Sequence, residues 1–338
     1  MKLRVGLVGL GSAWEQRHAP ALRTLSDRYD VRAICEQVFH HAERAAEEFG
    51  AEAVDGYRAL AERSDIDAIM MLSPQWCGAL PIVAACEAGK AVYCGAVLDL
   101  NREAARELKQ RVQQSGVAFM AELPRRHAAA TLRLKELIAT HLGPPRIVFA
   151  HQRVRGHIAG RNGLPGRQPP TVTEHLIELI DWCRYVVGRE SQSVLSCAHR
   201  LDGGGRSDYE MISLEFAADE GQAPPVAQIS CGDYIAPDWP EAITFRPPAA
   251  MQISCERGVA FIDLPATLIW FDEAGRHKES LETERPVGEQ LLSQFHRAVT
   301  SLVRRSDLDD AYRALTILNA ARESQTSGAR VPLEFDLV

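Results

Sequence analysis

The sequence lacks the features that mark membrane-spanning, secreted and nucleic-acid-binding proteins. No charge-free apolar run approaches the roughly 18 residues that a membrane helix needs. The chain begins Met-Lys-Leu-Arg-Val-Gly-Leu-Val-Gly, without the small-residue cleavage site of a signal peptide. The net charge is −7, and no Lys/Arg-rich block offers a basic face for nucleic acid. We therefore expect a cytoplasmic protein whose partners are small molecules, with no nucleic-acid or membrane partner.

Paired cysteines and abundant lysine are also missing. The eight cysteines are scattered without a Cys-x-x-Cys pair, which favours reduced, mostly buried thiols over a disulfide framework or a zinc knuckle. We therefore expect no structural metal. Among 38 basic residues only five are lysines, namely Lys2, Lys90, Lys109, Lys135 and Lys278. A reaction that needs a lysine side chain has few candidates in this chain.

The length of 338 residues exceeds what one hydrophobic core usually supports, so we expect two domains. Over the first part of the chain, short apolar runs alternate with longer amphipathic stretches, a pattern typical of a doubly wound parallel sheet. This pattern predicts an N-terminal Rossmann domain over residues 1–123. Its strands are expected at residues 4–8, 31–35, 68–72, 91–94 and 118–120, and its helices at 19–26, 41–48, 57–62, 78–88 and 102–115. Asn101 is the expected N-cap of the last helix.

After Leu123-Pro124 the pattern changes to strands without long helices between them. Strands are expected at residues 194–198, 209–216, 227–231, 251–255 and 267–271, and helices at 128–140, 173–186, 288–303 and 308–324. Consecutive strands of this kind pair in a mostly antiparallel sheet. We therefore expect residues 124–338 to form an α+β domain that follows the α/β Rossmann domain.

A glycine-rich turn and an acidic residue follow the first two expected strands. The first strand runs into Gly9-Leu10-Gly11-Ser12-Ala13-Trp14, and the second ends in Cys35-Glu36. Glycines let the backbone approach a pyrophosphate, and a carboxylate at the second place accepts hydrogen bonds from a ribose. The predicted dinucleotide-binding residues are Gly9, Gly11, Ser12, Ala13, Trp14 and Glu36. Trp14 departs from the usual small residue, and a tight turn with Glu36 as a surface charge is the alternative.

Glu36 also bears on the choice of cofactor. A carboxylate accepts hydrogen bonds from the ribose hydroxyls of NAD but repels the 2′-phosphate of NADP, and Gln37 and Val38 supply no compensating cation. The sequence thus predicts NAD, with NADP less favoured. Further cofactor candidates, at the ends of the third and fourth strands, are Ser73, Pro74 and Cys94.

Several short motifs occur in order along the chain. They are Gly9-Leu10-Gly11, His18-Ala19-Pro20-Ala21-Leu22, Asp67-Ala68-Ile69 with Ser73-Pro74, Glu87-Ala88-Gly89-Lys90-Ala91-Val92, Arg125-Arg126, Ile180-Asp181-Trp182-Cys183-Arg184-Tyr185 with Gly188, and Ala320-Ala321-Arg322-Glu323-Ser324. This series resembles the glucose-fructose oxidoreductase and myo-inositol dehydrogenase family. The resemblance implies a Rossmann domain and a second domain whose open sheet mediates homodimers or homotetramers. It also implies hydride transfer between NAD or NADP and a sugar, inositol or related polyol at the cleft between the domains.

Two family signatures are altered in this chain. The family usually reads Cys-Glu-Lys-Pro after the fourth strand, with the lysine assisting proton transfer, whereas this chain reads Cys94-Gly95-Ala96-Val97. The lysine position is therefore Ala96. The family also carries an Asp and a His four residues apart on a later helix, and these positions hold Glu174 and Glu178 here. His175 lies beside Glu174, about 100° around the helix from the place of the family histidine.

Glu174, His175 and Glu178 are nevertheless the expected catalytic residues. With Asp181, the two glutamates recur at i, i+4 and i+7 and lie along one helical face. Neighbouring carboxylates repel each other, which can leave Glu178 protonated as an acid and Glu174 ionised as a base. The alternatives are a divalent metal bound with His175 or Glu122, and a solvated or salt-bridged helix face.

The remaining candidates are expected to contact the substrate, because they follow strand ends or lie on the same helix. They are Gln75, Trp76, Glu122, Arg126 and Asp181. For Trp76, packing is the alternative. We expect an NAD(P)-dependent oxidoreductase that acts on a polyol-like substrate. Two other functions stay open: a dinucleotide-binding homologue without dehydrogenase activity that acts as a sensor or assembly subunit, and a lyase or hydrolase that uses Glu174, His175 and Glu178.

Overall fold

The computed structural model describes residues 2–74, 76–95, 98–154, 172–200, 208–219, 221–235, 238–282, 285–301 and 307–335. The chain forms two compact units. The first contains Met1–Glu122 and Arg285–Tyr312, and the second contains most of the chain between them together with Arg313–Val338. No described helix combines the length and the apolar content that a membrane span requires.

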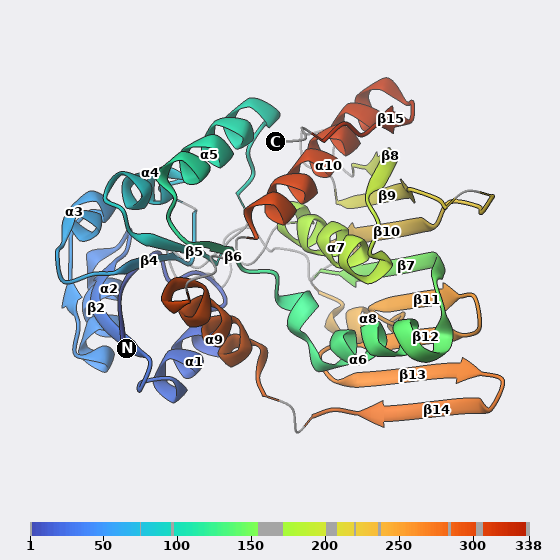
Figure 1. Cartoon of the computed structure of the whole chain (residues 1–338), viewed down its shortest axis with the longest axis horizontal. Helices are drawn as coiled ribbons and strands as arrows, with labels where there is room; N and C mark the ends of the chain where they lie inside the picture. The colour runs from blue at the N-terminus through green and yellow to red at the C-terminus, as the bar shows by residue number, and fades with distance from the viewer. Residues whose placement is uncertain are drawn as a thin grey trace. The chain divides into compact units, whose positions relative to one another are not determined.

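The first unit is built on a six-stranded parallel sheet with the strand order β3-β2-β1-β4-β5-β6 (Figure 1). This order is that of a Rossmann fold, so the predicted α/β class is confirmed. The strands are β1 (Leu3–Val8), β2 (Tyr29–Cys35), β3 (Glu52–Ala53), β4 (Ala68–Met71), β5 (Ala91–Cys94) and β6 (Phe119–Ala121). All but the two-residue β3 were expected from the apolar runs.

Helices connect these strands, all but η1 near the expected places. They are η1 (Trp14–His18), α1 (Ala19–Thr24), α2 (Phe39–Phe49), α3 (Tyr57–Glu62), α4 (Leu80–Glu87) and α5 (Arg102–Ser115). The N-cap expected at Asn101 is confirmed, because its side chain accepts a hydrogen bond of 2.9 Å from the Ala104 amide. Gly116 ends the same helix in the left-handed conformation at φ 63°.

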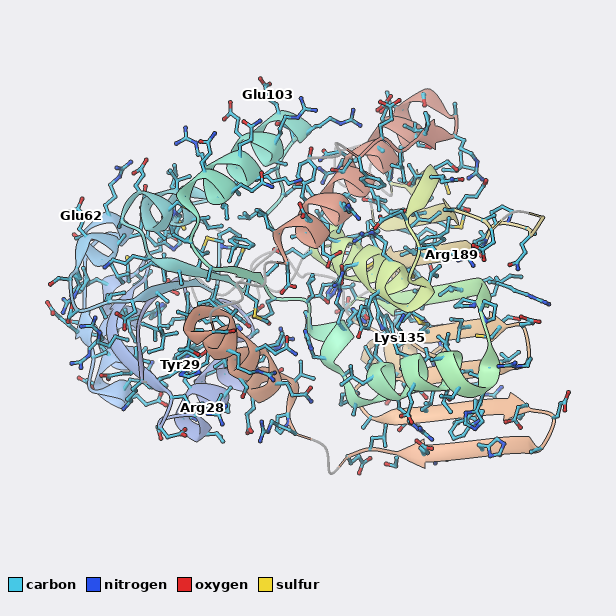
Figure 2. The ribbon with its side chains drawn as sticks, in the orientation of Figure 1. Arg28, Tyr29, Glu62, Glu103, Lys135 and Arg189 are labelled. Atoms are coloured by element: carbon cyan, nitrogen blue, oxygen red, sulfur yellow. The ribbon has the colours of Figure 1, made fainter. Side chains whose placement is uncertain are left out.

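A helix from the C-terminal part of the sequence completes the first unit. Helix α9 (Val287–Thr300) packs on α1 and contacts β6. The hydroxyl of Tyr29, labelled in Figure 2, donates a hydrogen bond of 2.6 Å to the Leu292 carbonyl. The rings of Tyr93 and Phe295 lie 5.3 Å apart in the buried core. Residues more than 150 positions apart in the chain thus share one hydrophobic core.

The second unit contains a nine-stranded sheet with the order β14-β13-β12-β11-β7-β10-β9-β8-β15. Its strands are β7 (Pro145–Arg153), β8 (Ser191–His199), β9 (Tyr209–Phe216), β10 (Val226–Gly232), β11 (Met251–Cys255), β12 (Val259–Asp263), β13 (Thr267–Asp272), β14 (Gly275–Ser280) and β15 (Val331–Pro332). Neighbours pair antiparallel except β7 and β10, which pair in parallel. The expected mostly antiparallel sheet is confirmed.

Helices cover one face of this sheet. Helix α7 (Val172–Val187) packs on β7 and β10, and α6 (Ala129–Leu137) packs on β12 and β13 (Figure 1). Along β7, Val148 and Ala150 are buried, whereas the alternate residues Ile147 and Phe149 are 45% and 41% exposed. The opposite face of the sheet therefore presents apolar side chains to solvent. The other helical segments are η2 (Pro124–His127), η3 (Ile138–Leu142), α8 (Pro240–Thr244) and α10 (Leu308–Ser327).

Candidate functional site

The turn after β1 fits only glycine at two positions. Gly9 and Gly11 adopt positive φ angles of 66° and 69°. A Cβ atom on Gly9 would lie 2.7 Å from the Ser73 carbonyl oxygen, and one on Gly11 would lie 2.6 Å from the Leu72 carbonyl oxygen. The turn therefore presses against the residues that follow β4. Such a side-chain-free cradle at the carboxyl ends of parallel strands is what a pyrophosphate needs.

Glu36 lies directly beside this turn. Its carboxylate accepts hydrogen bonds from the Leu10 amide, at 2.5 Å, and from the Gln37 amide, at 2.9 Å. The first bond joins the end of β2 to the glycine turn, across 26 positions of sequence. In a Rossmann fold this is the place of the carboxylate that binds a ribose. The residues present thus fit a dinucleotide.

The three other cofactor candidates in this turn, Ser12, Ala13 and Trp14, differ in how exposed they are. Ser12 is exposed and Ala13 is half-buried. The indole of Trp14 is 2% exposed and packs against Phe49, with ring centroids 5.6 Å apart, so this side chain belongs to the core. A large residue fits here because the chain forms a wide π-turn over Trp14–His18 in place of an ordinary α-helical start.

The remaining candidates of the first unit lie at strand ends, as expected. Ser73 and Pro74 follow β4, and Cys94 is the last residue of β5. The Trp76 ring lies 6.3 Å from that of Tyr57, and its indole nitrogen is buried without a hydrogen-bond partner among the described residues. Gln75 and Ala96 lie outside the described residues.

Three of the five lysines have structural partners. Lys90 donates hydrogen bonds to the carbonyls of Arg63 and Ile66, at 2.9 and 2.8 Å. Lys109 forms an ion pair of 2.9 Å with Asp309. Lys135 donates to the Tyr185 carbonyl at 2.9 Å and so satisfies the last turn of α7 (Figure 2). None of these three amines replaces the lysine that the family motif places at position 96.

Glu122 occupies the centre of a buried polar cluster in the first unit. Its carboxylate accepts hydrogen bonds from Arg17, from His18 Nε2 at 2.7 Å and from the Tyr93 hydroxyl at 2.8 Å. We call these four residues the Glu122 network. Glu122 was expected to contact the substrate, but its side chain is 2% exposed and engaged by these three partners. The sequence offered no signal for the partners beyond the His18 motif.

Charge and burial act in opposite directions on this network. Burial alone would raise the pKa of Glu122, but electrostatic attraction and hydrogen bonds from His18 and Arg17 outweigh it and lower the pKa to about 2. Burial, together with the neighbouring carboxylate, raises the pKa of Tyr93 well above 10. At neutral pH the network therefore contains a carboxylate and a neutral phenol.

In the second unit, two consecutive arginines meet the acidic face of α7. Arg125 Nε donates to Glu178 at 3.2 Å, and Arg126 Nε donates to Asp181 at 2.7 Å. Asp181 is 2% exposed. Glu178 therefore forms an ion pair with Arg125, and the two substrate candidates Arg126 and Asp181 bind each other. For these two acids the structure shows a salt-bridged face.

His175 is the one expected catalytic residue with a buried, unpartnered ring atom. Its Nδ1 has no hydrogen-bond partner among the described residues. Burial lowers the pKa of His175 below 6.5; Glu178 opposes this shift and Arg125 adds to it. The imidazole is therefore mainly neutral at pH 7 and can accept a proton. Glu174 lies one residue earlier in the first turn of α7. No cluster of three or more metal-ligating side chains occurs in the described part of the chain.

Comparison with known proteins finds a family match in the Rossmann unit. Residues 3–123 match the sequence model of the GFO/IDH/MocA oxidoreductase family, NAD-binding Rossmann fold. The inositol 2-dehydrogenase of Cereibacter sphaeroides is 27% identical over 232 residues, which cover 64% of this chain and 64% of that protein. In its Rossmann unit, this chain therefore resembles the glucose-fructose oxidoreductase and inositol dehydrogenase family. The resemblance expected from the motifs is confirmed.

Two further known proteins are similar to this chain, each over a different length. The dTDP-3,4-didehydro-2,6-dideoxy-alpha-D-glucose 3-reductase of Actinomadura kijaniata is 35% identical over 118 residues, 35% of each chain. The aldose-aldose oxidoreductase of Caulobacter crescentus superposes with a TM-score of 0.83 at 15% identity, covering 98% of this chain and all of that one. The fold of that structure therefore extends through both units, while the family model matches residues 3–123.

Proposed function

We propose that this protein is an NAD-dependent oxidoreductase that acts on a secondary hydroxyl of a sugar, inositol or related polyol. The observation that carries the proposal is the Glu36 carboxylate held 2.5 Å from the Leu10 amide beside the glycine turn. NAD, when bound, supplies the hydride chemistry. Gly9 and Gly11 leave room for its pyrophosphate, and Glu36 accepts hydrogen bonds from a ribose. The relatives named above support a sugar-like substrate.

Oxidation of a hydroxyl also releases a proton, and we assign its acceptor to His175. NAD, when bound, would accept the hydride from the carbon, and Nδ1 of the neutral imidazole would accept the hydroxyl proton. The support is the unpartnered Nδ1 and the lowered pKa of this ring. Glu178 is less suited, because Arg125 binds its carboxylate. We leave Glu174 as a secondary candidate, because it lies beside His175 in the first turn of α7.

A substrate screen with matched histidine variants tests this function. The protein is mixed with NAD and a panel of inositols, aldoses and sugar nucleotides, and reduction is followed at 340 nm. With a substrate found, His175→Gln should lower kcat by about 10² to 10⁴, the usual contribution of a positioned acid or base, with NAD affinity unchanged. His40→Gln, at an exposed histidine, is the control. An unchanged kcat in His175→Gln contradicts the assignment.

The loss of the family lysine favours a second candidate function. Three of the lysines are held by carbonyls or a carboxylate, and Ala96 offers no titratable group. The chain would then bind the dinucleotide without dehydrogenase activity and act as a sensor or assembly subunit. Tight NADH binding together with no absorbance change across the panel would select this function over catalysis.

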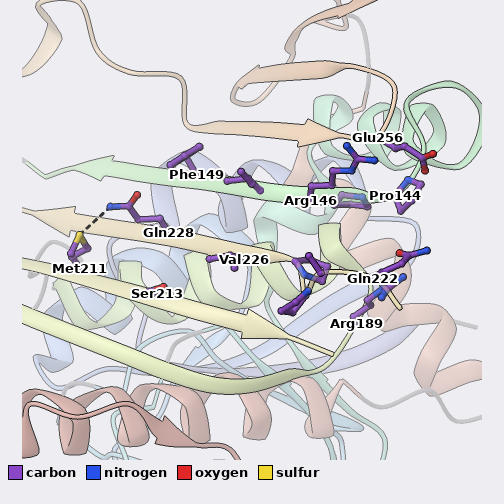
Figure 3. Close-up of a pocket in the computed structure, with 15 residues that line it drawn as sticks. Pro144, Arg146, Phe149, Arg189, Met211, Ser213, Gln222, Val226, Gln228 and Glu256 are labelled. Atoms are coloured by element: carbon purple, nitrogen blue, oxygen red, sulfur yellow. Dashed lines mark hydrogen bonds between the residues drawn. The ribbon is translucent and has the colours of Figure 1, made fainter. Parts of the chain in front are cut away.

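We also propose that the protein is a homodimer or homotetramer assembled through the open sheet face. This face carries a broad cavity of about 1030 Å³ over β7, β9 and β10, and Figure 3 shows Phe149, Val226 and Met211 lining it. Prolines at the neighbouring starts of β7 and β10 add apolar surface, namely Pro144, Pro145, Pro224 and Pro225. Contiguous exposed apolar surface of this kind is typical of protein interfaces.

A further inference from the structure

We propose that Glu122 is a positioning residue for the nucleotide turn, and that position 95 is glycine because the Glu122 carboxylate occupies the space beside it. The inference rests on the dinucleotide site proposed above. It deepens that proposal by assigning a role to the Glu122 network, which no part of the proposed reaction uses.

Arg17 and His18 of the Glu122 network belong to the helical turn that follows the glycines. The amides of Arg17 and His18 both donate to the Ala13 carbonyl, at 2.9 and 3.3 Å. The two residues are neighbours in sequence, and successive helical side chains point about 100° apart. They nevertheless bind one carboxylate, Arg17 at Oε1 and His18 at Oε2. The bonds of Arg17 and His18 to Glu122 therefore hold η1 in place directly after Ala13.

Glu122 ties that turn to the sheet. Glu122 directly follows β6, and its amide donates to the Cys94 carbonyl at 2.8 Å. Its Oε2 also accepts the Tyr93 hydroxyl from β5. One buried carboxylate thus joins η1, β5 and β6 at the carboxyl ends of the strands, where parallel sheets bind their ligands.

Gly95 marks the closest approach in this arrangement. A Cβ atom at Gly95 would lie 3.0 Å from Glu122 Oε2 and 2.9 Å from Leu72 Cδ2. Its φ is not positive, so the requirement is for space and not for a left-handed backbone. The same Leu72 lies under the nucleotide turn, because its carbonyl oxygen is the atom that a Cβ on Gly11 would meet. The contacts close a ring from Gly11 through Leu72 and Gly95 to Glu122, and back to the turn through Arg17.

Loss of the Glu122 carboxylate should shift the turn that follows β1. Without it, the buried Tyr93 hydroxyl and His18 Nε2 lose their acceptor, and Arg17 loses its counter-charge. These groups must then move or take up water, and η1 moves with them. A methyl group at position 95 should act in the same direction, because it displaces the carboxylate from His18.

A double-mutant cycle tests the inference. Wild type, Gly95→Ala, Glu122→Ala and the double variant are compared by urea unfolding and by NADH titration. Each single variant should weaken NADH binding by roughly tenfold, an effect of the size found for residues that interact in one network. Gly95→Ala should weaken NADH binding little further in the Glu122→Ala background, because the contact of the new methyl group with the carboxylate is then absent and only its contacts with Leu72 and Tyr93 side-chain atoms remain. Glu122→Gln, which keeps an acceptor, should lose less affinity than Glu122→Ala.

The matched control is the ion pair between Arg4 and Asp67. It joins the start of β1 to the residue before β4, at the opposite end of the strands from the nucleotide turn, with Arg4 Nε 3.0 Å from the carboxylate. Asp67→Ala should lower stability and leave NADH affinity unchanged. Equal NADH affinity in Glu122→Ala and Asp67→Ala, or simple additivity in the cycle, overturns the inference. If wild type itself binds no NADH, the proposed function fails and the positioning role falls with it.

Discussion

At the scale of single residues, burial suppresses the charge of His127. Desolvation, with a smaller effect from the Arg126 guanidinium, lowers the pKa of His127 from 6.5 to about 4. The folded pKa lies below the unfolded one, so the contribution of this residue to stability is complete above pH 6.5. It is lost as the pH falls towards 4, because the unfolded chain binds the proton first.

This shift predicts a pH-dependent effect of one substitution. Between pH 6.5 and 4, the free energy of unfolding of the wild type should fall more steeply than that of His127→Asn. His40→Asn, at an exposed histidine, should keep the wild-type slope. Urea unfolding at four pH values across this range measures the slopes. Identical slopes in wild type and His127→Asn would show that the ring is not protected from protonation.

Residues also differ in how far the sequence alone predicts their role. The glycine turn and Glu36 were predictable, because a local spacing dictates their geometry. The partners of Glu122 were not, since Arg17, Tyr93 and Glu122 come from three elements that only the folded sheet brings together. The ion pair between Arg125 and Glu178 was not predictable either, because the two residues lie 53 positions apart in the sequence.

At the scale of elements, helix α5 begins at a side-chain cap that the sequence predicts. The Asn101 side chain accepts the Ala104 amide and satisfies one of the free donors of the first turn. Asn101→Ala should lower the free energy of unfolding by about 1 kcal/mol. Gln114→Ala, at an exposed position later in the same helix, should change it little. Urea denaturation compares the two, and equal stabilities would argue against the cap.

Strand β7 shows where the pattern along the sequence fails. Its inward residues Val148 and Ala150 alternate with Ile147 and Phe149, which are also apolar, so the strand lacks the polar alternation of a half-buried strand. It is nevertheless central, because it pairs with β10 in parallel and with β11 antiparallel. Because apolar residues occupy both faces of β7, its sequence lacks the alternation that would have predicted a strand.

At the scale of the whole molecule, the exposed face of the nine-stranded sheet predicts self-association. Phe149→Glu places a charge in the middle of this face and should convert an oligomer to monomers. Leu132→Glu, at a residue of α6 with 42% exposure compared with 41% for Phe149, should leave the oligomer intact. Sedimentation velocity on the three proteins measures the outcome. A monomeric wild type, or an oligomer unaffected by Phe149→Glu, contradicts the interface.

The proposed function depends on the Rossmann unit, which we expect to bind NAD through the glycine turn and Glu36. Isothermal titration of wild type and Glu36→Ala with NAD and with NADP tests it most directly. Wild type should bind NAD at least about tenfold more tightly than NADP, because Glu36 hydrogen-bonds a ribose and repels a 2′-phosphate. Glu36→Ala should narrow this difference. Tighter binding of NADP by wild type, or no binding of either dinucleotide, would contradict the account.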